Sequence, residues 1–391
     1  MAGADLIAAL SARARALQAS QIRAVAECGM ARYDDVAPLW FGEGAWPTNP
    51  MIVDAAVASL KAGDHFYSPN NGDVALRDAI VSYTNDLYGT GFDRRRVTVA
   101  NSGLQALVLT ADLLTTAGDR VVTIGPNWPN IPGAFAGRDA EVIDVALAPR
   151  NGKWTLDMDT LLAALTPETK AVVVNSPHNP TGWTMTAEEQ RTLLDHCRQH
   201  GIWIVADDVY ARLYRWGDAA PSFLEIADAD DRLITVNSFS KAWSMTGWRL
   251  GWIVAPAAVE EKLGQLNEFN SSCSPAFIQA AGRVAIENSN AIVADLRAKI
   301  AAGYAIAAER LRAFDRVDFV EPDGAFYAFF KVRDLEDSYA GAMKILEETK
   351  VGLAPGVAFG VAGEGHLRLC YARPADDLER AFDRLATFLH G

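Results

Sequence analysis

The chain has few cysteines, and their spacing excludes several kinds of site. Only four occur among 391 residues, at Cys28, Cys197, Cys273 and Cys370, and no two form a CxxC pair. The six histidines show no HExxH spacing. This pattern excludes an ordinary zinc site and predicts reduced thiols in a cytoplasmic protein, with no bound metal.

Long apolar runs and excess positive charge are also missing. No apolar run approaches ~20 residues, so we expect no membrane-spanning helix. Acidic residues outnumber Lys and Arg by 49 to 36, for a net charge of -13. This balance argues against a nucleic-acid partner, because phosphate contacts need clustered cations. Residues 1–20 are rich in Ala and Arg and lack the apolar core of a signal peptide, which favours an ordinary first helix over a transit peptide.

The composition and the apolar runs that are present indicate a packed α/β protein. Half of the residues are hydrophobic and 22% are charged, over a length that suits one large domain and a smaller one. Seven short apolar runs are typical of strands buried on both faces of a mostly parallel sheet flanked by helices. They cover residues 97–99, 121–124, 142–145, 171–174, 202–205, 233–236 and 250–254. No GxGxxG motif follows any of them, so no dinucleotide site is predicted.

The pattern changes after about residue 290. An Ala-rich stretch predicts a long helix over 290–314, and residues 319–329 alternate like an antiparallel strand pair. Near the start, an amphipathic helix is expected over 5–28, broken by Gly29, and another over 49–62. We therefore expect a large domain of residues 48–290 and a smaller α+β domain of residues 1–47 and 291–391.

One lysine lies among residues that suit a particular cofactor. Lys241 follows a predicted buried strand in the segment Ser238-Phe239-Ser240-Lys241, with Arg249 eight residues later. A lysine that forms an imine works best when it is desolvated and near positive charge, because both lower its pKa. Serines and an arginine are suitable donors for a phosphate. An aldehyde and a phosphate occur together in pyridoxal phosphate.

This segment, with the following Gly247-Trp248-Arg249-Leu250-Gly251, resembles the lysine segment of class I/II aminotransferases of the fold-type I pyridoxal phosphate family. Asn179-Pro180-Thr181-Gly182 strongly resembles another motif of that family. The similarity runs from about residue 20 to the end of the chain. It implies pyridoxal 5′-phosphate as cofactor, amino acid and 2-oxo acid substrates, and a homodimer with sites at the subunit interface.

The resemblance also implies roles for individual residues around the cofactor. Its phosphate would be held by backbone and side chains of Ser102, Gly103, Leu104, Ser238, Ser240 and Arg249, and by Tyr67 from the neighbouring subunit. Its ring would be contacted by Trp128 on one face, Asn179 and Tyr210 at the phenolate oxygen, and Asp207 at the nitrogen. Chemistry alone leaves Asp207 and Asp208 as alternatives, because a buried carboxylate needs a partner in either position; the resemblance selects Asp207.

For the substrate, the resemblance implies that Arg368 grips the α-carboxylate, which an arginine can do bidentately. Arg373 lies close by, and the motif wording favours Arg368. Gly42 would offer its backbone to the same carboxylate, and Asn179 would also bind the substrate. In many aspartate aminotransferases of this subgroup a lysine stands where this chain has Leu104, which weakens a dicarboxylate preference. Trp46, Trp183 and Trp243 are candidates for lining an apolar or aromatic pocket.

The predicted reaction moves an amino group from an L-amino acid to a 2-oxo acid through an imine on Lys241, whose freed amine then acts as general base and acid. A β-lyase on the same fold would share every cofactor residue and stays an alternative. A sensor with a DNA-binding module is disfavoured, since only about forty residues precede the loop Gly42-Glu43-Gly44. A silent scaffold is disfavoured by the intact Lys241.

Overall fold

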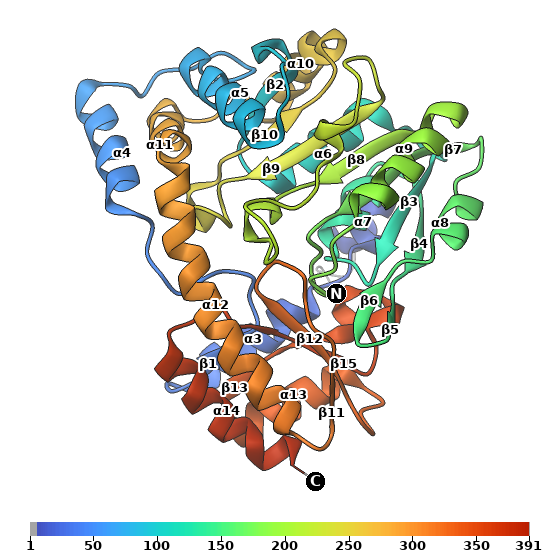
Figure 1. Ribbon diagram of the computed structural model, residues 1–391, viewed down its shortest axis with the longest axis vertical. Coiled ribbons are helices and arrows are strands. Elements are labelled where there is room, and N and C mark those ends of the chain that lie inside the picture. The colour runs from blue at the N-terminus through green and yellow to red at the C-terminus, as the bar shows by residue number, and fades with distance from the viewer. Residues whose placement is uncertain (1–5, 391) are drawn as a thin grey trace.

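The computed structural model describes residues 6–390 and contains the predicted seven-stranded sheet (Figure 1). Each of the seven apolar runs forms a strand, so the predicted α/β class is confirmed. The spatial order is β2 (Val97–Ala100), β10 (Gly251–Val254), β9 (Leu233–Ser238), β8 (Trp203–Asp207), β7 (Thr169–Asn175), β3 (Arg120–Gly125) and β4 (Glu141–Ala146). Neighbouring strands are parallel except at β10, which is antiparallel to both β2 and β9.

The two faces of this sheet fill two separate apolar cores. Along β7, Val172 and Val174 pack into one core, while Ala171 and Val173 pack into the other. Successive side chains of a strand point to opposite faces, so an unbroken apolar run is what a strand covered on both sides requires. Helices α6 (Gly103–Leu114) and α7 (Asn130–Ala136) cover one face, and α5 (Val74–Tyr88) and α9 (Ala187–His200) cover the other.

The C-terminal part forms a second, antiparallel sheet of four strands. Its order is β11 (Val317–Phe319), β12 (Tyr327–Val332), β15 (His366–Cys370) and β14 (Ala354–Pro355). The antiparallel pair expected over 319–329 exists as β11 and β12, but its strands lie over 317–319 and 327–332, and most of the expected range is the connection between them. The long helix α12 (Ser289–Ala313) leads into this part, which α13 (Ser338–Thr349) and α14 (Ala375–Leu389) complete (Figure 1).

The N-terminal segment joins the same part of the molecule through a short strand. β1 (Ala37–Pro38) pairs with β13 (Val351–Gly352), and α3 (Gln21–Arg32) contacts α13. This arrangement supports our proposal that residues 1–47 belong with residues 291–391. The remaining helices and strands are α4 (Pro50–Ala62), α8 (Met158–Ala164), α10 (Glu260–Ser271), α11 (Ala276–Glu287) and the hairpin β5 (Ala148–Arg150) and β6 (Lys153–Thr155).

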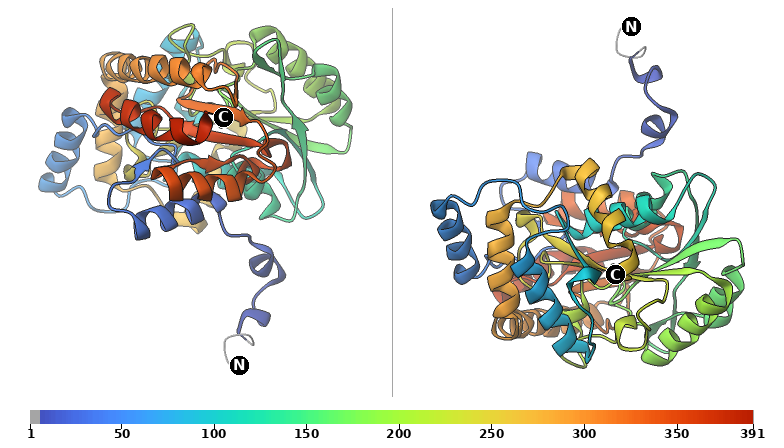
Figure 2. Two further views of the ribbon diagram at one scale, coloured as in Figure 1. Left: turned by 90° about the horizontal axis from the view of Figure 1, so that it is seen from below. Right: turned by 90° about the horizontal axis from the view of Figure 1, so that it is seen from above.

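The helix expected over 5–28 differs from the structure. Its residue 5 lies outside the described part. The rest divides into a short helical stretch at residues 6–8, α2 (Ala12–Ala16), and α3, which begins after the cap Ser20. Helix α3 continues through Gly29, where a Cβ would lie 2.7 Å from ring carbons of Trp40. Gly29 therefore permits close packing and does not end the helix. Figure 2 shows the segment with α2 extending away from the rest of the molecule.

Within residues 6–390, no helix is long and apolar enough to cross a membrane. The same residues contain no cluster of three or more His, Cys, Asp or Glu side chains that could hold a metal ion.

Candidate active site

A cavity of about 590 Å³ opens at the carboxyl ends of the parallel strands, beside the antiparallel sheet. In doubly wound α/β proteins, loops at these strand ends meet at one edge of the sheet and carry the reactive groups. Most of the predicted site residues line the cavity: Gly42, Gly103, Leu104, Trp128, Asn179, Asp207, Tyr210, Ser238, Ser240, Lys241, Arg249 and Arg368.

Two predicted residues lie outside the lining. Ser102 caps α6, and its hydroxyl accepts a hydrogen bond from the backbone N–H of Gln105 at 3.0 Å. Tyr67 lies on the loop between α4 and α5 with 91% of its surface exposed. This position gives Tyr67 no role at the cavity of its own subunit.

Lys241 lies on the loop that follows β9, and its amine points into the cavity. Its Nζ donates to the carbonyl of Gly42 at 2.6 Å. Burial, assisted by the nearby guanidinium of Arg368, lowers the pKa of Lys241 to about 8. About a tenth of the amine is therefore unprotonated at pH 7, far more than for a lysine with its ordinary pKa of 10.5, and the unprotonated form is the one that acts as a nucleophile or a general base.

Asp207 ends β8 and is buried with very few partners. Among the described residues, the carboxylate accepts a single hydrogen bond, a long one of 3.4 Å from the backbone N–H of Val209 to Oδ1. Burial raises the pKa of Asp207 to about 7, an effect partly offset by that hydrogen bond and by Lys241. Asp208 faces away from the cavity and accepts a hydrogen bond from Ser222 at 3.2 Å. A buried carboxylate placed like Asp207 calls for a cationic or N–H partner from a ligand.

Arg368 on β15 is held in place and keeps one donor free. Its Nη1 donates to Asn179 Oδ1 at 2.8 Å, and its Nη2 donates to the carbonyl of Trp40. Its Nε is buried without a partner among the described residues. Asn179 is itself fixed, because its backbone N–H donates to Asn175 Oδ1 at 2.8 Å. A fixed guanidinium with donor capacity left over suits the recognition of a carboxylate.

The opposite corner of the cavity has the features of a phosphate site. The backbone at Gly103 opens α6, so its N–H groups have no partner within the helix. Ser238 packs against Gly103, where a Cβ would lie 3.1 Å from that of Ser238, and Ser240 N–H donates to Ser238 Oγ at 3.1 Å. Arg249 makes no ion pair within residues 6–390, and its Nη1 donates to the carbonyl of Thr246 at 2.6 Å. These groups together fit a dianionic phosphate.

The structure adds residues that the sequence did not single out. Tyr327 on β12 lies 2.7 Å from Tyr210, hydroxyl to hydroxyl. A Cβ at Gly42 would overlap the Tyr327 hydroxyl, so only glycine fits at residue 42. The alternating pattern over 319–329 placed Tyr327 in a strand, but nothing in that pattern identified its neighbours. Further lining residues are Arg23, Phe41, Glu43, Asn175 and Thr246.

The expectation for the three tryptophans is wrong. Trp46, Trp183 and Trp243 are absent from the lining of this cavity. Trp183 and Trp243 are buried in the core, and Trp243 Nε1 donates to the carbonyl of Ala285 at 3.0 Å. Trp46 lines a separate hollow near α12. Large aromatic side chains most often serve packing, as they do here.

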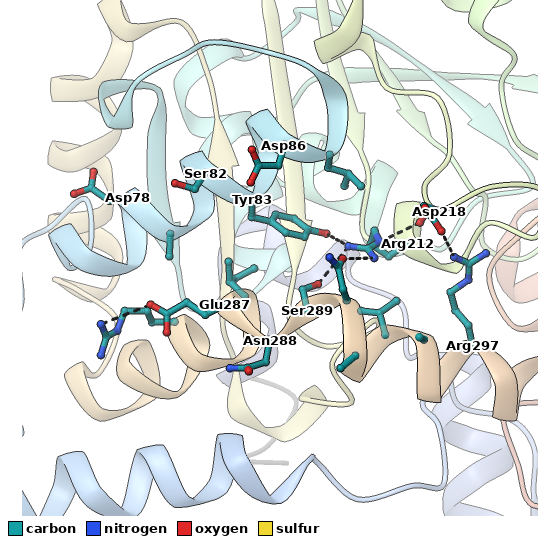
Figure 3. Close-up of a pocket in the computed structure, with 18 of the residues that line it drawn as sticks. Asp78, Ser82, Tyr83, Asp86, Arg212, Asp218, Glu287, Asn288, Ser289 and Arg297 are labelled. Atoms are coloured by element: carbon teal, nitrogen blue, oxygen red, sulfur yellow. Dashed lines mark hydrogen bonds and ion pairs between the residues drawn. The ribbon is translucent and has the colours of Figure 1, made fainter.

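A larger cavity of about 1150 Å³ lies between α5 and the junction of α11 with α12 (Figure 3). Its polar side chains bind one another: Arg212 donates to Tyr83 at 3.2 Å, and Arg297 pairs with Asp218 at 3.4 Å. None of the predicted site residues lines it. The Lys241 cavity is therefore the candidate active site.

The fold and this cavity together define an α/β enzyme whose reactive groups lie on loops at the carboxyl ends of parallel strands. A family model described as aminotransferase class I and II matches residues 38–385. The chain belongs to the class I and II aminotransferases, as its sequence motifs indicated.

Individual relatives agree over nearly the whole chain. The aspartate aminotransferase of Thermotoga maritima is 32% identical over 372 residues, which cover 95% of this chain and 96% of the relative. The aromatic-amino-acid aminotransferase 2 of Thermococcus litoralis is 30% identical, covering 97% and 98%. Among solved structures, a single mutant of Thermus thermophilus aspartate aminotransferase superposes with a TM-score of 0.91 at 29% identity, covering 97% of this chain and 99% of that one. The predicted fold and the aminotransferase activity are thus confirmed.

Proposed function

We propose that this aminotransferase uses pyridoxal 5′-phosphate, bound covalently through Lys241, to move an amino group from an L-amino acid to a 2-oxo acid. One observation carries the proposal. The buried amine of Lys241, with its lowered pKa, shares a cavity with the carboxylate of Asp207, which has few hydrogen-bond partners, and with Arg368, whose Nε is unpaired among the described residues. When bound, the cofactor supplies an electron sink for the carbanion at the substrate Cα.

The residues of the cavity fit this cofactor at each of its polar ends. A protonated ring nitrogen would give Asp207 the partner that it lacks and would return its pKa toward the ordinary range. Tyr210 and Asn179 would hold the phenolate oxygen, and Trp128 would cover a ring face. The phosphate would be held by the backbone of Gly103 and Leu104 and by the side chains of Ser238, Ser240 and Arg249, while Ser102 caps the helix that presents this backbone.

Arg368 and Lys241 would act on the substrate. Arg368 would bind the α-carboxylate with its unpaired Nε and an adjacent N–H, beside Asn179 and the backbone of Gly42. This contact would orient the Cα–H bond toward the Lys241 amine. Lys241 would then remove the Cα proton and deliver a proton to the C4′ carbon of the cofactor, as its lowered pKa allows near neutral pH.

We propose a homodimer in which Tyr67 reaches the partner's cofactor phosphate. Tyr67 lies next to exposed apolar side chains that a second copy would bury. Exposed apolar side chains in this part of the chain are Met51, Val53, Val57 and Leu60 on α4 and Phe66 on the following loop; Phe269 on α10 is also 90% exposed. Val57→Glu should lower the molar mass measured by light scattering from two chains to one. A mass that stays at one chain in the unmodified protein would contradict the proposal.

The substrate side chain would extend past an apolar wall. Phe41, Leu104, Leu107 and Trp128 are apolar residues of the cavity lining, which also includes Arg23. The cation found at residue 104 in many aspartate-specific enzymes is missing, so we propose a preference for apolar or aromatic amino donors. The named relatives include aspartate, aromatic-amino-acid and arginine–pyruvate enzymes. Screening donors against 2-oxoglutarate and pyruvate tests this preference.

A two-step spectroscopic assay tests the proposed reaction. Added pyridoxal phosphate should give the protein a visible absorbance band, a suitable amino acid should remove it, and a 2-oxo acid should restore it. A protein that gains no band would contradict the proposed cofactor. Pyruvate and ammonia released from a β-substituted amino acid, with no oxo acid added, would instead indicate a β-lyase.

A further inference from the structure

The Tyr210–Tyr327 pair joins the two sheets at the active site. Tyr210 follows β8 of the large sheet, and Tyr327 begins β12 of the antiparallel sheet. Their hydroxyl oxygens are 2.7 Å apart, the distance of a good O–H···O hydrogen bond. Within residues 6–390, neither hydroxyl has another hydrogen-bond partner. Only one of the two protons can lie between the oxygens, so one hydroxyl must donate and the other must accept.

The surroundings of Tyr327 restrict its hydroxyl to that contact. The backbone of Gly42 lies directly against the hydroxyl. The guanidinium of Arg368 lies over the ring, 4.5 Å from its centroid, and offers only donors. Both tyrosines line the cavity, and the one acceptor that the Tyr327 hydroxyl meets within residues 6–390 is Tyr210. If Tyr327 donates to Tyr210, the Tyr210 proton is left for a ligand oxygen in the cavity.

We propose that Tyr327 is a positioning residue, whose hydroxyl donates to the oxygen of Tyr210 and thereby directs the Tyr210 proton at the phenolate oxygen of the cofactor. The inference rests on the proposed cofactor and adds a residue with a defined task. Hydrogen bonds in such a chain polarise one another, so the donor nearest the cofactor becomes stronger. A stronger hydrogen bond to the phenolate oxygen would stabilise its negative charge and so lower the pKa of Lys241 Nζ in its linkage to the cofactor.

Other charged groups near the pair set the background for a pH titration. Burial raises the pKa of both tyrosine hydroxyls, so both remain protonated and able to donate at neutral pH. The titratable or charged groups that face the pair from neighbouring elements are Asp207, Lys241, Arg368, Cys370 and Glu43. These groups are the same in the unmodified protein and in the tyrosine variants. A difference between their titrations therefore reports on the missing hydroxyl.

The test is a pH titration of the visible band of the holoenzyme. Tyr327→Phe should raise the apparent pKa of that band by about 0.5 to 1 unit, as expected for one lost hydrogen bond. Tyr210→Phe should raise it at least as much. In the Tyr210→Phe background, adding Tyr327→Phe should change the pKa by less than about 0.2 unit, because the relay is already broken. Tyr371→Phe is the matched control, since in residues 6–390 the one hydrogen bond of its buried hydroxyl goes to the carbonyl of Ala325 at 3.5 Å, away from the Tyr210–Tyr327 pair.

Several outcomes would overturn the inference. An unchanged titration for Tyr327→Phe would mean that the hydroxyl only packs against Gly42, and additive shifts in the double variant would mean that it acts independently of Tyr210. If Tyr327→Phe fails to fold, 3-fluorotyrosine at residue 327 provides an alternative test. Its more acidic hydroxyl donates a stronger hydrogen bond and should lower the apparent pKa of the visible band. A raised or unchanged pKa there would contradict the relay. A wild-type protein without any visible band would instead overturn the proposed cofactor, and this inference with it.

Discussion

Replacing Arg368 with lysine tests how the substrate carboxylate is held. The guanidinium keeps Nε free while Nη1 and Nη2 donate to Asn179 and to the carbonyl of Trp40. A lysine has a single charged nitrogen and cannot satisfy both fixed acceptors and bind a carboxylate with two parallel hydrogen bonds. Loss of one charge-assisted hydrogen bond costs about 1.5 to 3 kcal/mol, so kcat/KM for amino donors should fall about 10- to 150-fold.

The assay compares steady-state kcat/KM of Arg368→Lys with that of Arg373→Lys. Arg373 is the matched control, because it lies outside the cavity and its Nη2 donates to the carbonyl of Pro38 at 2.7 Å. Within the described part of the chain the Arg373 Nε is also buried without a partner, so the two variants differ in whether the arginine lines the cavity and not in having a buried Nε. We expect Arg373→Lys to stay within about threefold of the unmodified enzyme. Equal losses in the two variants, or a loss below threefold for Arg368→Lys, would refute the assignment.

Three further predictions concern proton binding and packing. A native pKa of Asp207 near 7, above the ordinary 3.8, means that the cofactor-free protein loses stability as pH rises through that interval. In denaturant unfolding at pH 8, the free energy of unfolding of Asp207→Asn should therefore exceed that of the wild type by about 2 to 4 kcal/mol. This difference should shrink by pH 5 and should change sign when the cofactor is saturating. Equal differences at pH 8 and pH 5 would contradict the raised pKa. Gly251→Ala should lose about 1 to 3 kcal/mol in the same assay, because its Cβ would lie 2.7 Å from backbone atoms, whereas Gly247→Ala, with nothing within 4 Å, should not. Acylation of Lys241 in the cofactor-free protein, followed by peptide mass spectrometry, should show a midpoint near pH 8, and a midpoint near 10 would refute the lowered pKa.

Much of the large sheet could be predicted from the sequence, because its strands are covered on both sides. Such strands must be apolar at successive positions, as Val172, Val173 and Val174 are, and this signal is local. The same rule placed Asp207 and Lys241 at one edge of the sheet, since parallel strands bring their carboxyl ends together. The motif resemblance then separated Asp207 from Asp208, which local chemistry alone had left open.

The errors arose where contacts distant in the sequence decide the outcome. Gly29 was predicted to end a helix, yet its lack of a side chain is used for packing against Trp40, a contact that no periodicity encodes. Trp243 was a pocket candidate but is fixed in the core by the carbonyl of Ala285. Tyr327 was missed because its partner, Tyr210, is 117 residues away and on the other sheet. Pairings between the two sheets are visible only in the folded chain.

Borohydride reduction of the protein with pyridoxal phosphate tests the central claim most directly. Reduction makes a lysine–cofactor linkage permanent, and peptide mass spectrometry then identifies which of the chain's lysines carries the added mass. The account predicts a single modified peptide carrying the label on Lys241, and none in Lys241→Ala. A label on another lysine, or no label while the visible band persists, would contradict it.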